Sequence, residues 1–236
     1  MSYNWKTAGQ EFIYKLLNPV INLLVKIGIK PNSITLFGLF INIIACCVFI
    51  YGAEKTERAH HIYIGVGSGI ILFGGLMDMI DGRLARVAKM ESKYGALFDS
   101  VLDRYSEMFM FLGICYYLVR QHYFLSSLFA FIAMIGSIMV SYNRARSEGL
   151  GVKMADVGLM QRPERILLIG ISGILCGLTS NSLGGDYKIT VDWLPFPLFE
   201  TITVFTFPIF ILAILSNFTA ISRLLFAKKA LSNNNQ

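Results

Sequence analysis

Residues 78–103 read DMIDGRLARVAKMESKYGALFDSVLD and place four aspartates in a chain that is otherwise mostly apolar. Asp78 and Asp81 are three residues apart and Asp99 and Asp103 are four apart, so each pair projects from one face of its helix. The link between the pairs is long enough to end one helix and begin a second, antiparallel one. A carboxylate inside a bilayer costs about 2.5–3.5 kcal/mol at a helix centre on insertion scales. The stretch therefore predicts a site where facing helices bind divalent cations.

The composition is typical of an integral membrane protein, since 55% of the 236 residues are hydrophobic and 15% are charged. Five uncharged runs approach or exceed the length needed to cross about 30 Å of hydrocarbon as a helix. They are residues 33–51, 62–77, 123–142, 166–185 and 201–222. A sixth, 108–119, reaches that length only if its helix begins among the aspartates. We therefore predict an all-α membrane protein with six transmembrane helices.

Residues 1–30 predict a separate amphipathic helix that lies in the membrane interface, because apolar residues recur there at helical spacing among scattered charges. Pro19 should bend or divide that helix. The six-helix transmembrane domain, which carries the aspartates, would then occupy residues 31–226, and residues 227–236 would form a polar tail.

The basic residues predict how the chain is oriented, because Lys and Arg are enriched in short cytoplasmic loops. Sixteen of them lie in the N-terminal segment, the 83–93 link, the 144–165 link and the C-terminal end, whereas the opposite side of the membrane has four. We expect a multi-pass protein of the inner membrane with both termini and the aspartates at the cytoplasmic face. The net charge of +6 then reflects orientation and not nucleic-acid binding.

Ligands that are all oxygen atoms favour Mg²⁺ or Mn²⁺. Two such ions about 3.5–4 Å apart can clamp the attacking and leaving oxygens of a phosphoryl displacement. Gly82 and Ala85, at helical spacing from the acids, would let a bulky ligand approach the helix backbone, and Arg86 could then meet a phosphate. Close helix packing explains the two small residues equally well.

The pattern Asp78-x2-Asp81-Gly82-x2-Ala85-Arg86-x8-Gly95-x3-Asp99-x3-Asp103 resembles the signature of the CDP-alcohol phosphotransferase family of membrane enzymes, with no departure at its eight positions. The resemblance implies transfer of a substituted phosphoryl group from a CDP-linked donor, such as CDP-diacylglycerol, to an alcohol with release of CMP. It also implies six transmembrane helices and a homodimer.

Carried onto this sequence, the resemblance makes Asp78, Asp81 and Asp99 ligands of one metal ion, and Asp78, Asp99 and Asp103 ligands of a second. Asp103 would also be the general base that takes the proton of the acceptor hydroxyl. The residues expected to bind the CDP group are Pro31, Asn32, Thr35, Asp78, Gly82, Ala85 and Arg86. The PNSIT segment that contains the first three is also an ordinary helix start.

A second group of candidate residues lies in SYNRARSEGLG (141–151) and QRPER (161–165). Arginine presents a planar fork that suits phosphate oxygens, so arginines beside the metal site favour an acceptor that carries its own phosphate. The same arginines would also serve to anchor helix ends to anionic headgroups. The region resembles the acceptor site of the phosphatidylinositol-phosphate synthases in this family, which use inositol phosphate. The residues so implicated are Ser141, Arg144, Arg146, Arg165 and Arg223.

Arg144 departs from that pattern, because many of those synthases carry lysine at its position. Glycerol 3-phosphate is also phosphorylated, so phosphatidylglycerophosphate synthase is the alternative within the family. An alternative from another class is a cation transporter, because acids on facing membrane helices also bind ions in transit. The acids, however, lie near one membrane face, and the sequence has no evident internal repeat.

Other polar residues are expected to have structural roles. Arg104 and Glu107 follow Asp103 on the same helix and should pair with charges on neighbouring helices, because an unpaired charge at this depth is costly. His60, His61 and His122 fall near the far side of the membrane and are expected at the surface.

Overall fold

The computed structural model describes residues 5–56, 60–154, 158–191, 193, 197 and 199–233, with the side chains of 16–56, 60–154, 158–191, 193, 197 and 199–232. Its helices are α1 (Trp5–Ile27), α2 (Pro31–Lys55), α3 (Ile62–Val87), α4 (Lys93–Arg120), α5 (Phe124–Gly149), α6 (Arg162–Leu183) and α7 (Thr203–Asn233). Two short strands, β1 (Lys188–Ile189) and β2 (Phe199–Glu200), pair antiparallel between α6 and α7. The ends of the expected interfacial helix (1–4) and of the polar tail (234–236) lie outside the described residues.

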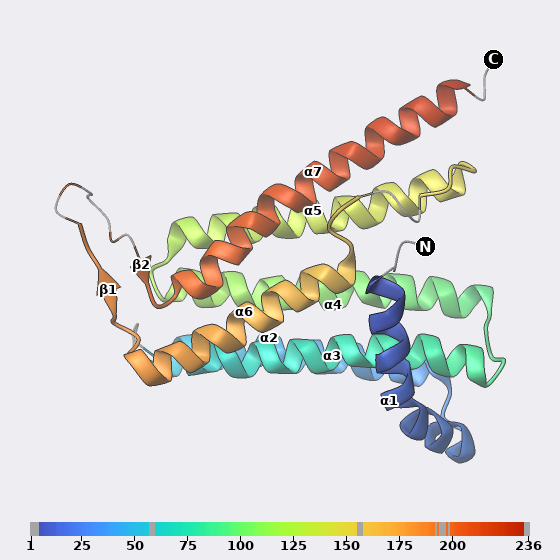
Figure 1. Cartoon of the computed structure of the whole chain (residues 1–236), viewed down its shortest axis with the longest axis horizontal. Helices are drawn as coiled ribbons and strands as arrows, with labels where there is room; N and C mark the ends of the chain where they lie inside the picture. Colours follow the sequence, from blue (N-terminus) through green and yellow to red (C-terminus); the bar gives the residue numbers. More distant parts are fainter. Residues whose placement is uncertain are drawn as a thin grey trace.

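The predicted all-α membrane architecture is confirmed. Helices α2, α3, α5, α6 and α7 are each long and apolar enough to cross a membrane, which makes this a multi-pass membrane protein. Helix α4 has more charged residues near its start, but at 28 residues it is about 42 Å long and runs alongside the others (Figure 1). It is the predicted third span, and it does begin among the aspartates. All six helices exceed the uncharged runs because they continue into charged ends.

Helix α2 is the centre of one half of the bundle, because both α3 and α4 pack along it, and α6 packs on the other side of α3. Helices α5 and α7 pack along each other, and α7 slants away from the other helices toward the C-terminus (Figure 1). The two halves share one apolar core. Phe49 of α2 stacks on Phe205 of α7 with ring centroids 6.5 Å apart, and its ring meets the edge of Tyr117 of α4 at 6.3 Å.

Helix α1 lies across the bundle at the end that carries the aspartates, packed on α3 (Figure 1). Leu17 and Ile21 are buried there, whereas Leu16, Leu23 and Ile27 are more than half exposed. One apolar face thus meets protein and the other is left for lipid, as expected of an interfacial helix. The helix includes Pro19, and its ribbon changes direction part-way along its length.

The expectation of a surface position is wrong for His61. This residue is fully buried at the far end of the bundle, and its Nδ1 lies 3.2 Å from the hydroxyl of Tyr117. Its backbone N–H donates to the hydroxyl of Ser180 on α6 at 3.1 Å. His61 directly precedes α3 and is covered there by the end of α6. The composition of the loop alone does not reveal this contact.

Close packing of α2 against α4 depends on Gly113. A Cβ at this position would lie 2.8 Å from the Cα and 3.2 Å from the carbonyl oxygen of Cys46, and backbone atoms cannot move aside cheaply. We expect Gly113→Ala to destabilise the protein by about 1–3 kcal/mol through overpacking, measured as a lower thermal unfolding temperature of the purified protein in detergent.

The matched control is Gly69→Ala on α3, where a Cβ would meet no atom within 4 Å. There the better helix propensity of alanine should leave stability unchanged or raise it by up to about 1 kcal/mol. Equal unfolding temperatures for the two variants would contradict the close approach of α2 and α4.

Candidate active site

The four aspartates lie at one end of the bundle, on the last turns of α3 and the first turns of α4. The connection between these helices is short: α3 ends at Val87 and α4 begins at Lys93, where the Ser92 hydroxyl caps the helix by accepting from the Gly95 N–H at 2.9 Å. Along their described residues, α3 and α4 pack against α2 but hardly against each other. The space that this leaves between them is where the aspartates face each other.

A cavity of about 250 Å³, which we call the glycine cavity, lies between the start of α2, the end of α3 and the start of α4. A Cβ built on Gly82 would meet only the Nη2 atom of Arg86, at 4.0 Å, so the absence of a side chain there keeps the cavity open. Its lining residues are Pro31, Asn32, Thr35, Asp81, Gly82, Ala85, Arg86, Met90, Glu91, Ser92, Gly95, Ala96 and Asp99. Every residue predicted to bind CDP lines it except Asp78.

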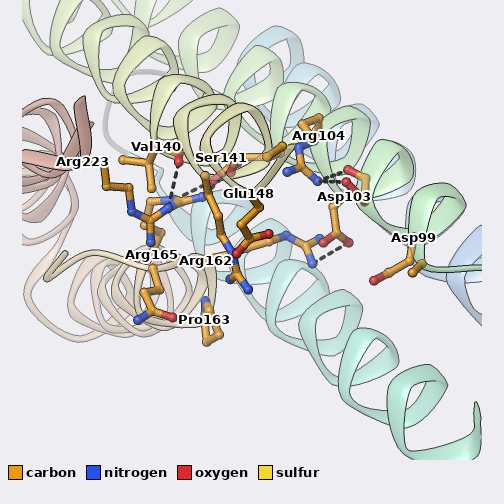
Figure 2. Close-up of a pocket in the computed structure, with 16 residues that line it drawn as sticks. Asp99, Asp103, Arg104, Val140, Ser141, Glu148, Arg162, Pro163, Arg165 and Arg223 are labelled. Carbon is orange, nitrogen blue, oxygen red and sulfur yellow. Dashed lines mark hydrogen bonds and ion pairs between the residues drawn. The ribbon is translucent and has the colours of Figure 1, made fainter. Parts of the chain in front are cut away.

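A larger cavity of about 560 Å³, the arginine cavity, lies between α4, α5, α6 and α7 (Figure 2). Its lining includes Ala96, Asp99, Ser100, Asp103, Arg104, Glu107, Val140, Ser141, Arg144, Ala145, Glu148, Gln161, Arg162, Pro163, Arg165 and Arg223. Because Ala96 and Asp99 line both cavities, the two meet at the first turns of α4. A molecule in each would therefore approach the other beside the aspartates.

The structure brings together four of the five residues predicted for the acceptor, and Arg146 is the exception. Ser141, Arg144, Arg165 and Arg223 line the arginine cavity, whereas Arg146 is exposed and does not. Residues two apart on a helix point to different faces, so α5 cannot direct both Arg144 and Arg146 inward. Arg146 therefore lies outside the arginine cavity, which the sequence did not predict.

Arg165 is almost fully occupied by other protein groups. Its Nε and Nη2 donate to the two carboxylate oxygens of Glu107 at 2.7 and 3.1 Å, and its Nη1 donates to the carbonyl of Met160 at 3.0 Å. The side chains of Arg165 and Glu107 are 1% and 3% exposed. This forked pair joins α6 to α4 and forms a wall of the arginine cavity, and it supplies the partner that the sequence predicted for Glu107.

Two further arginines are also anchored. Arg223 Nη1 donates to the Val140 carbonyl at 2.8 Å, which ties α7 to α5. Arg144 Nε donates to Glu148 at 3.0 Å, with both side chains more than 40% exposed. Arg144 is therefore the most accessible of the arginines that line the cavity.

Arg162, which the sequence reasoning did not assign to the site, contacts the aspartates directly. Its Nη1 atom lies 2.6 Å from Asp103 Oδ1 (Figure 2) and 2.6 Å from Asp78 Oδ2, so one nitrogen bridges α4 and α3. Arg162 and Arg165 are three residues apart on α6 and share a face. That spacing could have implicated both arginines of QRPER, but it could not indicate which of them reaches the aspartates.

The aspartates fit a hard divalent cation in number and in kind. Asp81 is only 5% exposed, and its Oδ2 atom is buried with no hydrogen-bond partner in the described part of the chain. A buried carboxylate oxygen without a donor calls for a cation. Among the described residues, no group of three carboxylate, thiolate or imidazole side chains is already drawn together around one point. With Arg162 between Asp78 and Asp103, the acids surround a shared space without converging on it.

Comparison with known proteins identifies the relatives of this chain. The family model described as CDP-alcohol phosphatidyltransferase matches residues 29–221. A phosphatidylinositol phosphate synthase of Mycobacteroides abscessus is 31% identical over 170 residues, which cover 72% of this chain and 73% of that protein. An archaetidylinositol phosphate synthase of Pyrococcus horikoshii is 32% identical over 176 residues, which cover 73% of this chain and 82% of that protein.

A solved structure has the same fold. The phosphatidylinositol phosphate synthase of Mycobacterium tuberculosis with CDP-DAG bound aligns with a TM-score of 0.70 over 90% of this chain and 94% of its own, at 22% identity. The same enzyme in complex with manganese and citrate aligns with a TM-score of 0.67. The shared fold covers nearly the whole transmembrane bundle.

The Arg165–Glu107 pair should be essential for stability. Arg165→Ala leaves Glu107 buried without its partner, so we expect a loss of about 3–5 kcal/mol, seen as a large drop in the thermal unfolding temperature in detergent. Replacing both residues by apolar ones, Arg165→Met with Glu107→Leu, should recover much of that loss because no charge is left unpaired.

The control is Glu148→Ala, which breaks the exposed Arg144–Glu148 pair of α5. Exposed pairs four residues apart are worth about 0.3–0.5 kcal/mol, so this variant should unfold near the wild-type temperature. If Arg165→Ala were as stable as Glu148→Ala, Arg165 would not be the anchor described above.

Proposed function

The chain belongs to the CDP-alcohol phosphatidyltransferase family, and we propose that it transfers the phosphatidyl group of CDP-diacylglycerol to inositol phosphate, giving phosphatidylinositol phosphate and CMP. The observation that carries this proposal is the meeting of two cavities at Asp99, one lined by the small residues of α3 and the other by arginines. A family enzyme joins two substrates, and this geometry provides a separate compartment for each. Family membership makes the chain an enzyme and leaves no support for a cation transporter.

The glycine cavity suits the CDP group. Gly82 and Ala85 expose the backbone of α3 to it, and Pro31, Asn32 and Thr35 close it from α2. Arg86 also lines this cavity and can meet a phosphate. CDP-diacylglycerol bound here would place its diphosphate toward Asp78 and Asp99 and its acyl chains toward the lipid. The structure of the Mycobacterium tuberculosis phosphatidylinositol phosphate synthase, which was solved with CDP-DAG bound, supports this choice of donor.

Asp78, Asp81, Asp99 and Asp103 are the residues that would hold two Mg²⁺ or Mn²⁺ ions, which when bound neutralise the diphosphate and the departing CMP oxygen. Asp103 lines the arginine cavity, on the side from which an acceptor must approach. We propose that its carboxylate acts as the general base and accepts the proton of the acceptor hydroxyl. The hydroxyl oxygen then bonds to the phosphatidyl phosphorus, the bond from that phosphorus to the CMP oxygen breaks, and CMP leaves.

The arginine cavity favours an acceptor that carries a phosphate. Arg144 and Arg223 line it from α5 and α7, and Ser141 adds a hydroxyl to the same lining. A neutral alcohol would need no such concentration of positive charge. Inositol phosphate is preferred because the relatives are named phosphatidylinositol phosphate synthase and archaetidylinositol phosphate synthase. Glycerol 3-phosphate is the second candidate, since arginine recognises the phosphate and not the polyol, and Arg144 stands where many of those synthases have lysine.

The location of the protein follows from the same argument. The basic residues concentrate at the end of the bundle that holds both cavities, and Lys and Arg are enriched in short cytoplasmic loops. We therefore propose an inner-membrane enzyme whose active site and termini face the cytoplasm. A homodimer is the assembly that the family resemblance implies.

The acceptor is tested by CMP release from the purified protein with CDP-diacylglycerol and Mg²⁺, comparing inositol 1-phosphate, free inositol and glycerol 3-phosphate. We expect rapid release only with inositol 1-phosphate. Preference for glycerol 3-phosphate would retain the family chemistry and overturn the acceptor, whereas preference for free inositol would overturn the role given to the arginines.

The base is tested with Asp103→Asn. General-base catalysis contributes about 10²–10⁴-fold, so kcat should fall by at least that factor while the Kd for CDP-diacylglycerol changes little. Because Asp103 is also a proposed metal ligand, Mn²⁺ binding is measured in the same variant. Loss of turnover with Mn²⁺ still bound supports the base, loss of Mn²⁺ binding assigns the defect to the ligand role, and an active variant removes Asp103 from the base role.

A further inference from the structure

Arg162 differs from the other arginines of the cavity in the partners it has. Arg165 is held by Glu107 and Met160, and Arg104 donates to the Ser100 hydroxyl at 2.7 Å. Arg162 instead uses one nitrogen for two carboxylates that belong to different helices, at 2.6 Å each. Both carboxylates are among the proposed metal ligands. Arg162 therefore joins the proposed metal site to the arginine cavity.

The bridge solves an electrostatic problem. Asp78 and Asp103 are only 20% exposed, and without a cation between them their charges would repel in a medium that screens weakly. The Nη1 atom of Arg162 takes the position between the two oxygens and supplies that cation. A divalent ion bound by the same two oxygens would need the same position, and two cations cannot share it.

We propose that Arg162 is an internal counter-ion that leaves Asp78 and Asp103 when a divalent ion binds, and that its guanidinium then becomes a ligand for the acceptor phosphate. The inference rests on the proposed function, because it takes the aspartates as the metal site. The inference adds a coupling between the metal site and the acceptor phosphate site. Metal binding raises the affinity for a phosphate-bearing acceptor, and the acceptor raises the affinity for metal.

The position of Arg162 in the fold permits this exchange. It is the first residue of α6, and its side chain already lines the arginine cavity and is 18% exposed. In Figure 2 its side chain lies between Asp103 on one side and Arg165 and Arg223 on the other. A rotation of the side chain, without movement of α6, would take the guanidinium from the aspartates into the cavity. Arg165 and Arg223 cannot take this role because their anchors are not metal ligands.

The first measurement is Mn²⁺ binding to the purified full-length protein in detergent, for the wild type, Arg162→Gln and Arg144→Gln. Arg144→Gln removes a positive charge from the same cavity without touching the aspartates, so it controls for the general effect of charge. We expect Arg162→Gln to bind Mn²⁺ about tenfold more tightly than the wild type, a typical coupling between linked sites. Arg144→Gln should change the affinity by less than about threefold.

The second measurement is the affinity for inorganic phosphate with and without saturating Mn²⁺. In the wild type, Mn²⁺ should raise phosphate affinity by at least about fivefold. In Arg162→Gln the effect of Mn²⁺ should largely disappear, whereas Arg144→Gln should bind phosphate more weakly but keep the Mn²⁺ effect. Phosphate that binds directly to bound Mn²⁺ would give the same enhancement in all three proteins, and that result would overturn the proposal.

Arg162→Lys guards against a folding defect in the glutamine variant, because it keeps the charge but offers a single, less extended nitrogen. Its Mn²⁺ affinity should lie between those of the wild type and Arg162→Gln. If both Arg162 variants bound Mn²⁺ with the same affinity as Arg144→Gln, the counter-ion role of Arg162 would be overturned, but the proposed metal site would stand. A wild-type protein that binds no Mn²⁺, or binds it unchanged after Asp81→Asn, would instead overturn the proposed metal site, and the inference with it.

Discussion

The placement of negative charge at membrane depth is the constraint on which the rest of this structure depends. Asp78, Asp81, Asp99 and Asp103 lie on helices that must also cross hydrocarbon, and each carboxylate needs either a cation or a donor. The start of α6 lies at the same end of the bundle, and there Arg162 supplies a cation to two of the acids. Glu107 lies one turn further along α4 and is neutralised by Arg165, which shares a face of α6 with Arg162. The position of α6 is thus set by charge as much as by apolar packing.

Helix α2 allows the acids to face each other across a space. Both α3 and α4 pack closely along it, and small residues make this possible: Gly113 of α4 touches the backbone at Cys46, and a Cβ at Gly38 would meet Met77 and Asp78 at about the closest ordinary distance, 3.4–3.5 Å. Because α3 and α4 are held by α2 and hardly by each other, the gap between them stays open at the end that needs it. The glycine cavity is a consequence of this arrangement.

Much of this could be predicted from the sequence, because the determining signals are local. Helix spans follow from runs of apolar residues, and the residues of the glycine cavity lie within 31–35 and 81–99, two segments that the 78–103 pattern and PNSIT already mark. The arginine cavity draws on α4, α5, α6 and α7, and there the sequence identified the segments and four of the five predicted lining residues, but not every side chain. Arg146 was included although α5 turns it outward, and Arg162 was omitted although it reaches the acids. His61 was misjudged for the same reason, since its burial depends on how α6 covers the start of α3.

The division of the site between two sets of helices has a further consequence for how such enzymes differ. The aspartates, Gly82 and the glycine cavity belong to α2, α3 and the start of α4, so the groups that we propose for the nucleotide and the phosphoryl transfer lie in one contiguous third of the chain. Most groups that can distinguish one acceptor from another come from α5, α6 and α7. Changes there, such as arginine for lysine at position 144, alter the arginine cavity without touching the four aspartates. Arg162 is the exception, because it lines the arginine cavity and also contacts Asp78 and Asp103, so a change at this one position would act on both halves of the proposed site.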